Sequence, residues 1–394
     1  ALAILPADGH EDTRLDELST LPVSTLRRLQ SLCDAGGAVA AQAALAQLSL
    51  AAGLYAGPVL GLKTMPEHGF YDPEKGVLAD LQPQDKPLIL VSFYRSYLTA
   101  ADTAPVDALI TELRARGYAA YGAFAASLKT PAAADWLRAA LPELAPAAII
   151  NATAFSAQGS DGSASPLSTT GCPVFQVALS TARRKDWAEA DRGLSPADLA
   201  MHVVLPEVDG RIFAGVISFK SPGRKDPDLE YSRFAHRADA DRVTAAIDRV
   251  EGWLRLAQLP NADKRLALVL STYPGRDHNL AHAVGLDALA SCDQILRALW
   301  DQGYSVEPQD HSGQRLMVET LSVPLAEYMT SLAPLPPELR DSLNQAWGSP
   351  EEDPVCRDGV FHFKALRAET ALIALQPERG EGKSRVDDYH DLAR

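Results

Sequence analysis

The amino-acid sequence predicts an α/β protein. We expect two open, mostly parallel, helix-covered sheet units that are joined by β-hairpins and preceded by a helical and linker segment. Three observations predict this class. Short apolar runs alternate with helical patterns from residue 87 onward, the same alternation restarts at Leu266, and the runs are continuously apolar, as in strands covered on both faces. Parallel pairing is expected because a helix usually connects two parallel strands.

The segment 1–86 is expected to be helical and linker-like. Ala1–Pro6 is predicted to be a strand, and helical patterns follow at Ser24–Leu32 and Ala38–Ala51. Gly53–Gly57 is predicted to be a further short strand. Residues 58–86 are punctuated by Gly and Pro without a clear period, which indicates a linker.

The first unit is expected to span residues 87–258 and to end in a central hairpin and a helix. Its strands are expected at Leu88–Phe93, Tyr118–Phe124, Ala147–Asn151 and Pro173–Leu179, and its helices at about Thr103–Arg116, Pro131–Ala140 and Ala240–Leu256. In open α/β sheets, ligands bind at the loops that follow the carboxyl ends of the strands. We therefore expect the rim of a cleft at Phe93–Asp102, Asn151–Asp161 and Ser180–Asp186.

The stretch Leu199–Lys220 is predicted to form the central β-hairpin. Met201–Leu205 and Arg211–Phe219 are apolar, partly β-branched runs. The sequence PEVDG between them has the composition of a tight turn in which Gly210 adopts a positive φ. Such a hairpin would bring together four chemically able side chains: His202, Glu207, Asp209 and Arg211. The alternative is that the acidic residues only form the turn and that the histidine is buried in a core hydrogen bond.

The second unit is expected to span residues 263–375, followed by a polar tail at 376–394. Strands are expected at Leu266–Ser271 and Tyr304–Val306, helices at about Ser291–Gln302 and Pro334–Asn344, and a hairpin of Gly359–Leu366 with Ala371–Leu375. Leu88–Phe93 in the first unit and Leu266–Ser271 in the second are both continuous apolar runs with polar loops after them. We expect each to be a central, buried strand of its own sheet.

The composition argues against several function classes. The net charge of −14 argues against nucleic acid as the main partner, because phosphate contacts need clustered Lys and Arg. No apolar run reaches the roughly 18 residues of a membrane helix. The four cysteines form no CxxC pair, which favours the reducing cytoplasm. No P-loop, GxGxxG or GxSxG motif occurs, so nucleotide binding and α/β-hydrolase chemistry have no support.

Six stretches, spread over nearly all of the chain, carry the pattern of one protein family. They are SYLTAADTAPVDAL at Ser96–Leu109, IINATAFS at Ile149–Ser156, SPADLAMHVVLPEVDGRIFAGVISF at Ser195–Phe219, TYPGRDHNLAHAVGLD at Thr272–Asp287, ALQPERG at Ala374–Gly380 and YHD at Tyr389–Asp391. In this order they resemble the large subunit of the aerobic, ATP-dependent cobaltochelatase, of the CobN type. That protein is related to the large, H-type component of magnesium chelatase.

The resemblance implies a metal chelatase of three components, a ligase that forms nitrogen–metal bonds. The large subunit of such an enzyme binds the tetrapyrrole and Co²⁺, which is the substrate metal. Two partner subunits, of the AAA+ and integrin-like types, use ATP with Mg²⁺, which this chain is not expected to bind. In the cobalt branch the macrocycle is hydrogenobyrinic acid a,c-diamide, and the pathway is cobalamin (vitamin B12) biosynthesis.

The resemblance and the expected hairpin together give candidate substrate-binding residues: His202, Glu207, Asp209, Arg211, Tyr273, Arg276, Gln376 and Arg379. No metal ligand is assigned, and the candidates for that role are His202 and His390. Imidazole and carboxylate groups suit Co²⁺ and also accept protons from pyrrole nitrogens. Aromatic side chains suit the apolar face of a macrocycle, although each is equally suited to core packing. The aromatic candidates are Phe93, Tyr94, Tyr97 and Phe155.

The sequence departs from the family in extent. The family's stretch of the form HxGTHGxxEW, which lies downstream of the YHD segment, does not occur here, and the chain starts without methionine inside an apolar run. We therefore expect an internal fragment that is inactive as a chelatase by itself, with its catalytic residues elsewhere. Three alternatives stay open: a magnesium or nickel chelatase large subunit, a module that only binds a tetrapyrrole or small ligand, and an arm that docks partner subunits.

Overall fold

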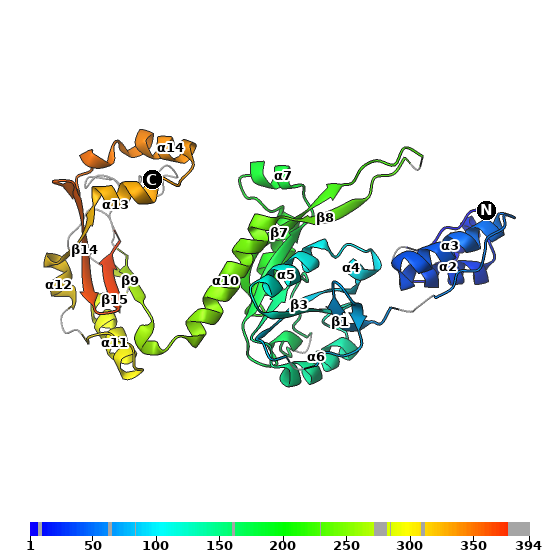
Figure 1. Ribbon diagram of the computed structural model, residues 1–394, viewed down its shortest axis with the longest axis horizontal. Coiled ribbons are helices and arrows are strands. Elements are labelled where there is room, and N and C mark those ends of the chain that lie inside the picture. The colour runs from blue at the N-terminus through cyan, green and yellow to red at the C-terminus, as the bar shows by residue number, and fades with distance from the viewer. Residues whose placement is uncertain are drawn as a thin grey trace. The chain divides into compact units, whose positions relative to one another are not determined.

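The computed structural model describes residues 1–6, 10–61, 65–82, 84–159, 162–228, 230–271, 282–283, 285–308 and 312–376. The chain divides into two compact units, Ala1–Arg255 and Leu256–Arg394. Each unit is built around its own β-sheet, as the ribbon in Figure 1 shows. The α/β class expected from the sequence is confirmed.

The amino-terminal segment is helical. Its helices are α1 (Thr13–Leu18), α2 (Val23–Ala35) and α3 (Gly37–Ala51), of which the last two confirm the helical patterns in the sequence. The two short strands expected in this segment, Ala1–Pro6 and Gly53–Gly57, are not strands. In α2 the apolar residues Leu26, Leu29 and Leu32 are buried at helical spacing, so this period was a more reliable signal than a run of a few apolar residues.

The first unit contains an eight-stranded sheet with the order β2-β1-β4-β3-β5-β6-β7-β8. The strands are β1 (His68–Asp72), β2 (Gly76–Leu78), β3 (Leu88–Tyr94), β4 (Ala119–Ala125), β5 (Ala148–Asn151), β6 (Val174–Ser180), β7 (Ile212–Pro222) and β8 (Phe234–Ala238). The five strands from β4 to β7 in this order are parallel, and the outer strands on both sides pair antiparallel. The first two strands lie in the stretch expected to be a linker, because Gly and Pro punctuation hid strands of five and three residues.

Helices cover both faces of this sheet. They are α4 (Arg95–Thr99), α5 (Ala104–Ala115), α6 (Pro131–Leu144), α7 (Arg184–Glu189) and α10 (Ala240–Gln258), with the 3-10 turn η1 at Pro166–Ser168. Along β3, Ile89 and Val91 belong to the same core cluster as α5 and α10, whereas Leu88 and Leu90 belong to the cluster that includes α6. Strand β3 is therefore central and buried, as predicted, and its continuous apolar run serves two cores.

The prediction of a central β-hairpin is wrong for its first strand. Residues 196–207 are helical: α8 (Pro196–Leu199), a π-helical turn η2 (Ala200–Val204) and α9 (Leu205–Glu207). The Oγ atom of Ser195 accepts a hydrogen bond from the backbone N–H of Asp198 at 3.1 Å, which caps the start of the helix. The turn before β7 is confirmed, with Gly210 at a φ of 72°.

The second unit has a five-stranded sheet in which β12, β14, β15 and β9 lie in that order and β13 pairs with β14. Its elements are η3 (Asn261–Asp263), β9 (Leu266–Leu270), β10 (His282–Ala283), β11 (Leu286–Asp287), α11 (Ala288–Asp301), α12 (Ser312–Val318), β12 (Thr320–Pro324), α13 (Leu325–Leu332), α14 (Pro337–Trp347), η5 (Pro350–Glu352), β13 (Cys356–Arg357), β14 (Val360–Ala368) and β15 (Ala371–Leu375). Strands β10 and β11 form a separate pair. The β14–β15 hairpin confirms the prediction for this region.

Three expectations for the second unit are wrong. Within the described strands, β9 pairs only with β15, so it lies at the edge of the sheet, and its residues are alternately half-buried and exposed. Residues 304–306 are not a strand. The sheet is also mostly antiparallel, with only β15 and β9 parallel. The strand β9 is therefore packed on one face only. Its sequence does not predict this, because both faces of the strand carry apolar residues.

Close packing at one glycine gives a test of the first core. A Cβ atom at Gly122 in β4 would lie 2.7 Å from Cε1 of Phe93, whereas a Cβ atom at Gly252 in α10 would meet nothing within 4 Å. We expect Gly122→Ala to lower the free energy of unfolding by about 1–3 kcal/mol through overpacking. Gly252→Ala should raise it by about 0.5–1 kcal/mol, because alanine favours a helix. Urea unfolding of both variants measures the difference, and equal effects would contradict this packing.

Candidate functional site

The strand order places a topological switch point beside β3. From β3 the chain first adds β4 on one side, and then β5, β6 and β7 follow on the other side. The loops after β3 and β5 therefore leave the sheet in opposite directions, and such a switch in strand order is where open α/β sheets bind ligands. The cleft rim expected at Phe93–Asp102 and Asn151–Asp161 begins at these two strand ends.

A buried hydrogen-bond network joins the carboxyl ends of these strands. Ser92 in β3 donates through Oγ to Oδ1 of Asn151 in β5, and Nδ2 of Asn151 donates to Oε1 of Gln176 in β6 at 2.7 Å. The same Oε1 atom accepts from Nη1 of Arg211 at 3.1 Å. Nη2 of Arg211 donates to Oδ2 of Asp209 at 2.6 Å. The network therefore fixes three neighbouring strands and the entry to β7 in one arrangement.

The ion pair of Asp209 and Arg211 is fully inside the protein. The two side chains are 0% and 1% exposed, respectively. Asp209 also accepts hydrogen bonds from Oγ of Ser156 and from the backbone N–H of Ala157, the latter at 2.7 Å. Burial lowers the pKa of Arg211, and the neighbouring carboxylate of Asp209 opposes this shift. A ligand carboxylate would reach Arg211 only by displacing Asp209.

The helical segment that replaces the hairpin carries a second buried carboxylate and a buried imidazole. Asp198 accepts from Oγ of Ser180 and from the backbone N–H of Thr181, both at 3.0 Å. His202, one turn further, is 6% exposed, and its Nδ1 atom has no hydrogen-bond partner among the residues that the structure describes. Burial lowers the pKa of His202, which Asp198 partly opposes. The imidazole is therefore held neutral near pH 7 with an unused polar atom.

A second histidine completes this polar group. His236 in β8 is 5% exposed, and its Nδ1 atom lies 3.1 Å from Oγ of Ser218. Its ring meets the ring of Tyr97 edge-on, with the centroids 5.8 Å apart. Burial lowers the pKa of His236, which the charge of Asp102 opposes and the charge of Lys220 reinforces. Burial, assisted by Asp102, raises the pKa of Tyr97 to about 12. Both rings are therefore kept uncharged.

An exposed apolar surface lies against the same helical segment. Its members are Phe155 (48% exposed), Val204 (53%), Leu205 (38%) and Val208 (60%), and we call them the apolar rim. The backbone N–H of Phe155 donates to the carbonyl of Met201 at 2.8 Å, so the loop after β5 is fastened to the helix. Phe155 has a φ of 65°, an uncommon conformation for a bulky residue. The loop and the helix thus present one apolar surface at the carboxyl edge of the sheet.

The structure brings together only some of the residues predicted for the site. Asp209 and Arg211 form a pair, His202 lies in the helix before them, and Glu207 is exposed at the end of α9. Gln376 follows β15, and its backbone N–H donates to the carbonyl of Leu270 at 2.9 Å. The remaining candidates lie outside the described residues: Tyr273, Arg276, Arg379 and His390. The expected cleft between the hairpin and residues 272–287 likewise falls largely outside them.

The aromatic candidates have different environments. Phe93 is 1% exposed and belongs to the core, which is the alternative considered from the sequence. Tyr94 donates through its hydroxyl to the carbonyl of Ala154 at 2.8 Å and so helps to hold the loop after β5. Phe155 is the aromatic candidate that is exposed.

Sequence reasoning missed several members of the buried polar groups. They are Ser92, Asn151, Gln176, Asp198 and His236. A signal for two of them was present, because Ser92 and Gln176 interrupt strands that are otherwise apolar, and a polar residue inside such a run must find a buried partner. No group of three or more His, Cys, Asp and Glu side chains placed to hold a metal ion occurs in the described part of the chain. None of the described helices is long and apolar enough to cross a membrane.

The fold is that of an open α/β protein, with a buried polar group and exposed apolar residues at the switch point, where such sheets commonly bind ligands. The chain belongs to the CobN/magnesium chelatase family, whose sequence model matches residues 35–393. It is 32% identical to the aerobic cobaltochelatase subunit CobN of Sinorhizobium sp over 421 residues, which cover 99% of this chain and 33% of the relative. It is 35% identical to the Pseudomonas aeruginosa protein of the same name over 327 residues, 78% of this chain and 26% of the relative.

Two further similarities extend this comparison. The H-type component of magnesium chelatase from Rhodobacter capsulatus is 27% identical over 286 residues, which cover 66% of this chain and 23% of that protein. The solved structure of the catalytic subunit of cobaltochelatase from Mycobacterium tuberculosis matches with a TM-score of 0.66 and 28% identity, over 99% of this chain and 34% of that one. The chain therefore spans about a third or less of the length of these relatives.

The two buried histidines predict how stability depends on pH. The folded-state pKa values of His202 and His236 lie below their ordinary value of 6.5. Below that pH the unfolded chain binds more protons than the folded chain, so the free energy of unfolding should fall as the pH is lowered from 7 to 5. His202→Gln should make this fall smaller in urea unfolding at several pH values. The control is His362→Gln, an exposed histidine in β14, and identical pH dependences in the two variants would contradict the role of burial.

The buried ion pair predicts strong coupling between its members. We expect Arg211→Met and Asp209→Leu each to lower the free energy of unfolding by about 3–5 kcal/mol, because each leaves an uncompensated buried charge. The double variant should be clearly more stable than the sum of the two effects predicts, and a double-mutant cycle measures this coupling. Lys185→Met, which breaks an exposed ion pair with Glu189, is the control and should change stability by less than about 1 kcal/mol. Additive effects of Asp209 and Arg211 would show that the pair does not act as one unit.

Proposed function

We propose that this chain is part of the tetrapyrrole-binding large subunit of an ATP-dependent cobaltochelatase. The proposed reaction is the insertion of Co²⁺ into hydrogenobyrinic acid a,c-diamide in cobalamin biosynthesis. The observation that carries the proposal is a difference in sequence identity. The chain is 32–35% identical to proteins named CobN and 27% identical to the H-type component of magnesium chelatase, and the latter match also covers less of the chain. Membership of the family supports chelation as the reaction, and the identities favour the cobalt branch.

The proposed binding surface is the apolar rim at the carboxyl edge of the first sheet. A tetrapyrrole has a broad apolar face, and ligand sites for such molecules are mostly apolar with a few polar groups. Phe155, Val204, Leu205 and Val208 offer the apolar part. The loop that carries Phe155 is fixed by hydrogen bonds to Met201 and Asp209, so the surface is largely formed before a ligand arrives.

His202 is the proposed polar group beneath this surface. Its imidazole is buried in the helical segment that exposes Val204 and Leu205, and its Nδ1 atom has no partner in the described part of the chain. Because burial lowers its pKa, the ring is neutral near pH 7. A neutral imidazole is able to accept a proton from a pyrrole nitrogen or to bind Co²⁺ transiently.

The other candidate residues have proposed roles at the periphery of the macrocycle. Glu207, Tyr273, Arg276, Gln376 and Arg379 are proposed to contact the peripheral carboxylates and amides, and His390 is proposed as a further metal ligand. Asp209 and Arg211 are proposed to act mainly by holding the loop after β5, since they are paired and buried. The two ATP-using partners, of the AAA+ and integrin-like types, are proposed to consume ATP with Mg²⁺ in the cytoplasm. The lack of a P-loop motif in this sequence supports that division of labour.

A magnesium or nickel chelatase is the second candidate, and the similarity to the H-type component of magnesium chelatase favours it. The two candidates differ in the macrocycle that is bound. A module that only binds a small ligand would show no response to the ATP-using partners. An arm that only docks those partners would bind no tetrapyrrole at all.

Tetrapyrrole binding to the full chain tests the proposal. We expect hydrogenobyrinic acid a,c-diamide to bind more tightly than a porphyrin, as measured by the change in macrocycle absorption during titration with protein. Phe155→Asn removes the exposed ring while asparagine still tolerates a positive φ, so the fold should persist. The variant should bind about tenfold more weakly or worse, which corresponds to a loss of about 1.4 kcal/mol.

Tyr55→Asn is the matched control, because this aromatic residue is 91% exposed and lies outside the apolar rim. It should bind like the unchanged chain. Equal weakening in both variants would remove the apolar rim from the proposal, and tighter binding of the porphyrin would favour the magnesium branch. If neither macrocycle binds, the alternative that the chain only docks partner subunits is favoured.

A further inference from the structure

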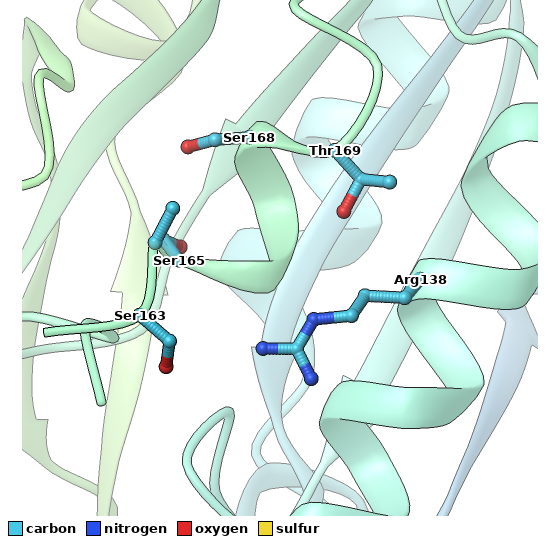
Figure 2. A pocket seen from close by; sticks show the side chains of 6 residues that line it. Arg138, Ser163, Ser165, Ser168 and Thr169 are labelled. Atoms are coloured by element: carbon cyan, nitrogen blue, oxygen red, sulfur yellow. The ribbon is translucent and has the colours of Figure 1, made fainter. Parts of the chain in front are cut away.

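A hollow in the first unit shares no residue with the carboxyl-edge site. It has a volume of about 480 Å³ and is formed by one residue of α6 and by the loop that leads into η1 and out of it. Its lining residues are Arg138, Ser163, Ala164, Ser165, Ser168 and Thr169 (Figure 2). None of them takes part in the buried network of Asn151 and Arg211, and none belongs to the stretches that carried the family resemblance.

The charge of this hollow is unusual for the protein. The chain has a net charge of −14, yet the lining residues that the structure describes include one arginine and no acidic residue. Arg138 is paired with Asp135 at 3.2 Å, but their side chains are 43% and 75% exposed, so water competes for the contact. The guanidinium group has five N–H donors, and the hydrogen bonds of the described residues use one of them. In Figure 2 the group reaches across the hollow toward the loop with Ser163 and Thr169.

A buried hydroxyl group in the hollow lacks a partner. Ser165 is 5% exposed, and its Oγ atom has no hydrogen-bond partner among the described residues. A buried hydroxyl without a partner is unfavourable, and an acceptor atom in the hollow would satisfy it. The hydroxyl of Thr169 already donates to the carbonyl of Pro166 at 2.7 Å, and Ser168 points away from Arg138 in Figure 2. The lining therefore offers donors from the Arg138 guanidinium and the Ser165 hydroxyl.

We propose that this hollow, which we call the Arg138 pocket, binds a small oxyanion: a carboxylate or a phosphate group. The forked guanidinium binds either group through two parallel hydrogen bonds, and a serine hydroxyl donates a further one. The anion would replace the exposed contact with Asp135 and would provide the acceptor that Ser165 lacks. The proposal does not depend on the tetrapyrrole site, because the two sites share no residue.

Thermal unfolding of the full chain with added anions tests the proposal. The midpoint is measured in sodium phosphate, in sodium acetate and in sodium chloride at equal pH and ionic strength, and the dissociation constant follows from the dependence on anion concentration. Because phosphate also stabilises proteins in general, a rise counts as binding only where Arg138→Gln removes it. Such a rise in phosphate alone would identify a phosphate-type ligand, and in acetate alone a carboxylate. A rise in both supports the shared chemistry, and no rise above the chloride series overturns the proposal.

Variants connect the binding to the Arg138 pocket. Arg138→Gln should raise the dissociation constant about tenfold or more, because it removes the charged donor. Arg192→Gln removes the same charge at an exposed position outside the pocket and should leave the constant unchanged. Ser165→Ala should weaken anion binding while it leaves the midpoint without anion unchanged or higher, since the hydroxyl has no partner to lose. Equal constants for Arg138→Gln and Arg192→Gln would show a general charge effect and would overturn the proposal.

Discussion

The arrangement at the carboxyl edge of the first sheet depends on the burial of two opposite charges. Neither Asp209 nor Arg211 is stable inside the protein without the other, because a lone buried charge is far more costly than a paired one. Further atoms of the pair find partners on Ser156, Ala157 and Gln176, whereas Nε of Arg211 has none among the residues that the structure describes. The loop after β5 is consequently drawn onto the end of the helical segment, which is the position that exposes Phe155 next to Val204 and Val208.

The sequence was most informative where one physical requirement acted alone. A strand covered on both faces must be apolar throughout, and β3 and β6 were visible for that reason. The repeat of apolar residues in α5 and α10 was equally clear. The same reasoning failed for Met201–Leu205, because a run of four apolar residues and one histidine fits a strand and a buried helical turn equally well. The Ser195-Pro196 pair before them is a helix start signal that decides between the two, and the structure shows the cap.

The candidate site was harder to predict than the fold because its parts are far apart in the sequence. The turn chemistry correctly indicated that Asp209 and Arg211 lie close together, but not that they are paired inside the protein rather than open to a ligand. That difference depends on Gln176 and Asn151, which come from other strands, and no local pattern connects them. The edge position of β9 escaped prediction for a similar reason, since strand order is decided by pairing between distant segments.

The π-helical turn η2 also determines which changes of chain length this region can accept. A π turn contains one residue more than an α turn. The directions in which Asp198 and Asp209 leave the helix axis therefore differ from those that an α-helix with the same number of residues would give. Rewinding Ala200–Val204 as ordinary α-helix with the same number of residues would rotate everything that follows by about 100°. Asp209 would then leave Ser156, while Asp198 would still face Thr181. A related chain with one residue fewer in this segment should therefore have an ordinary α turn here and keep Asp209 facing the loop after β5.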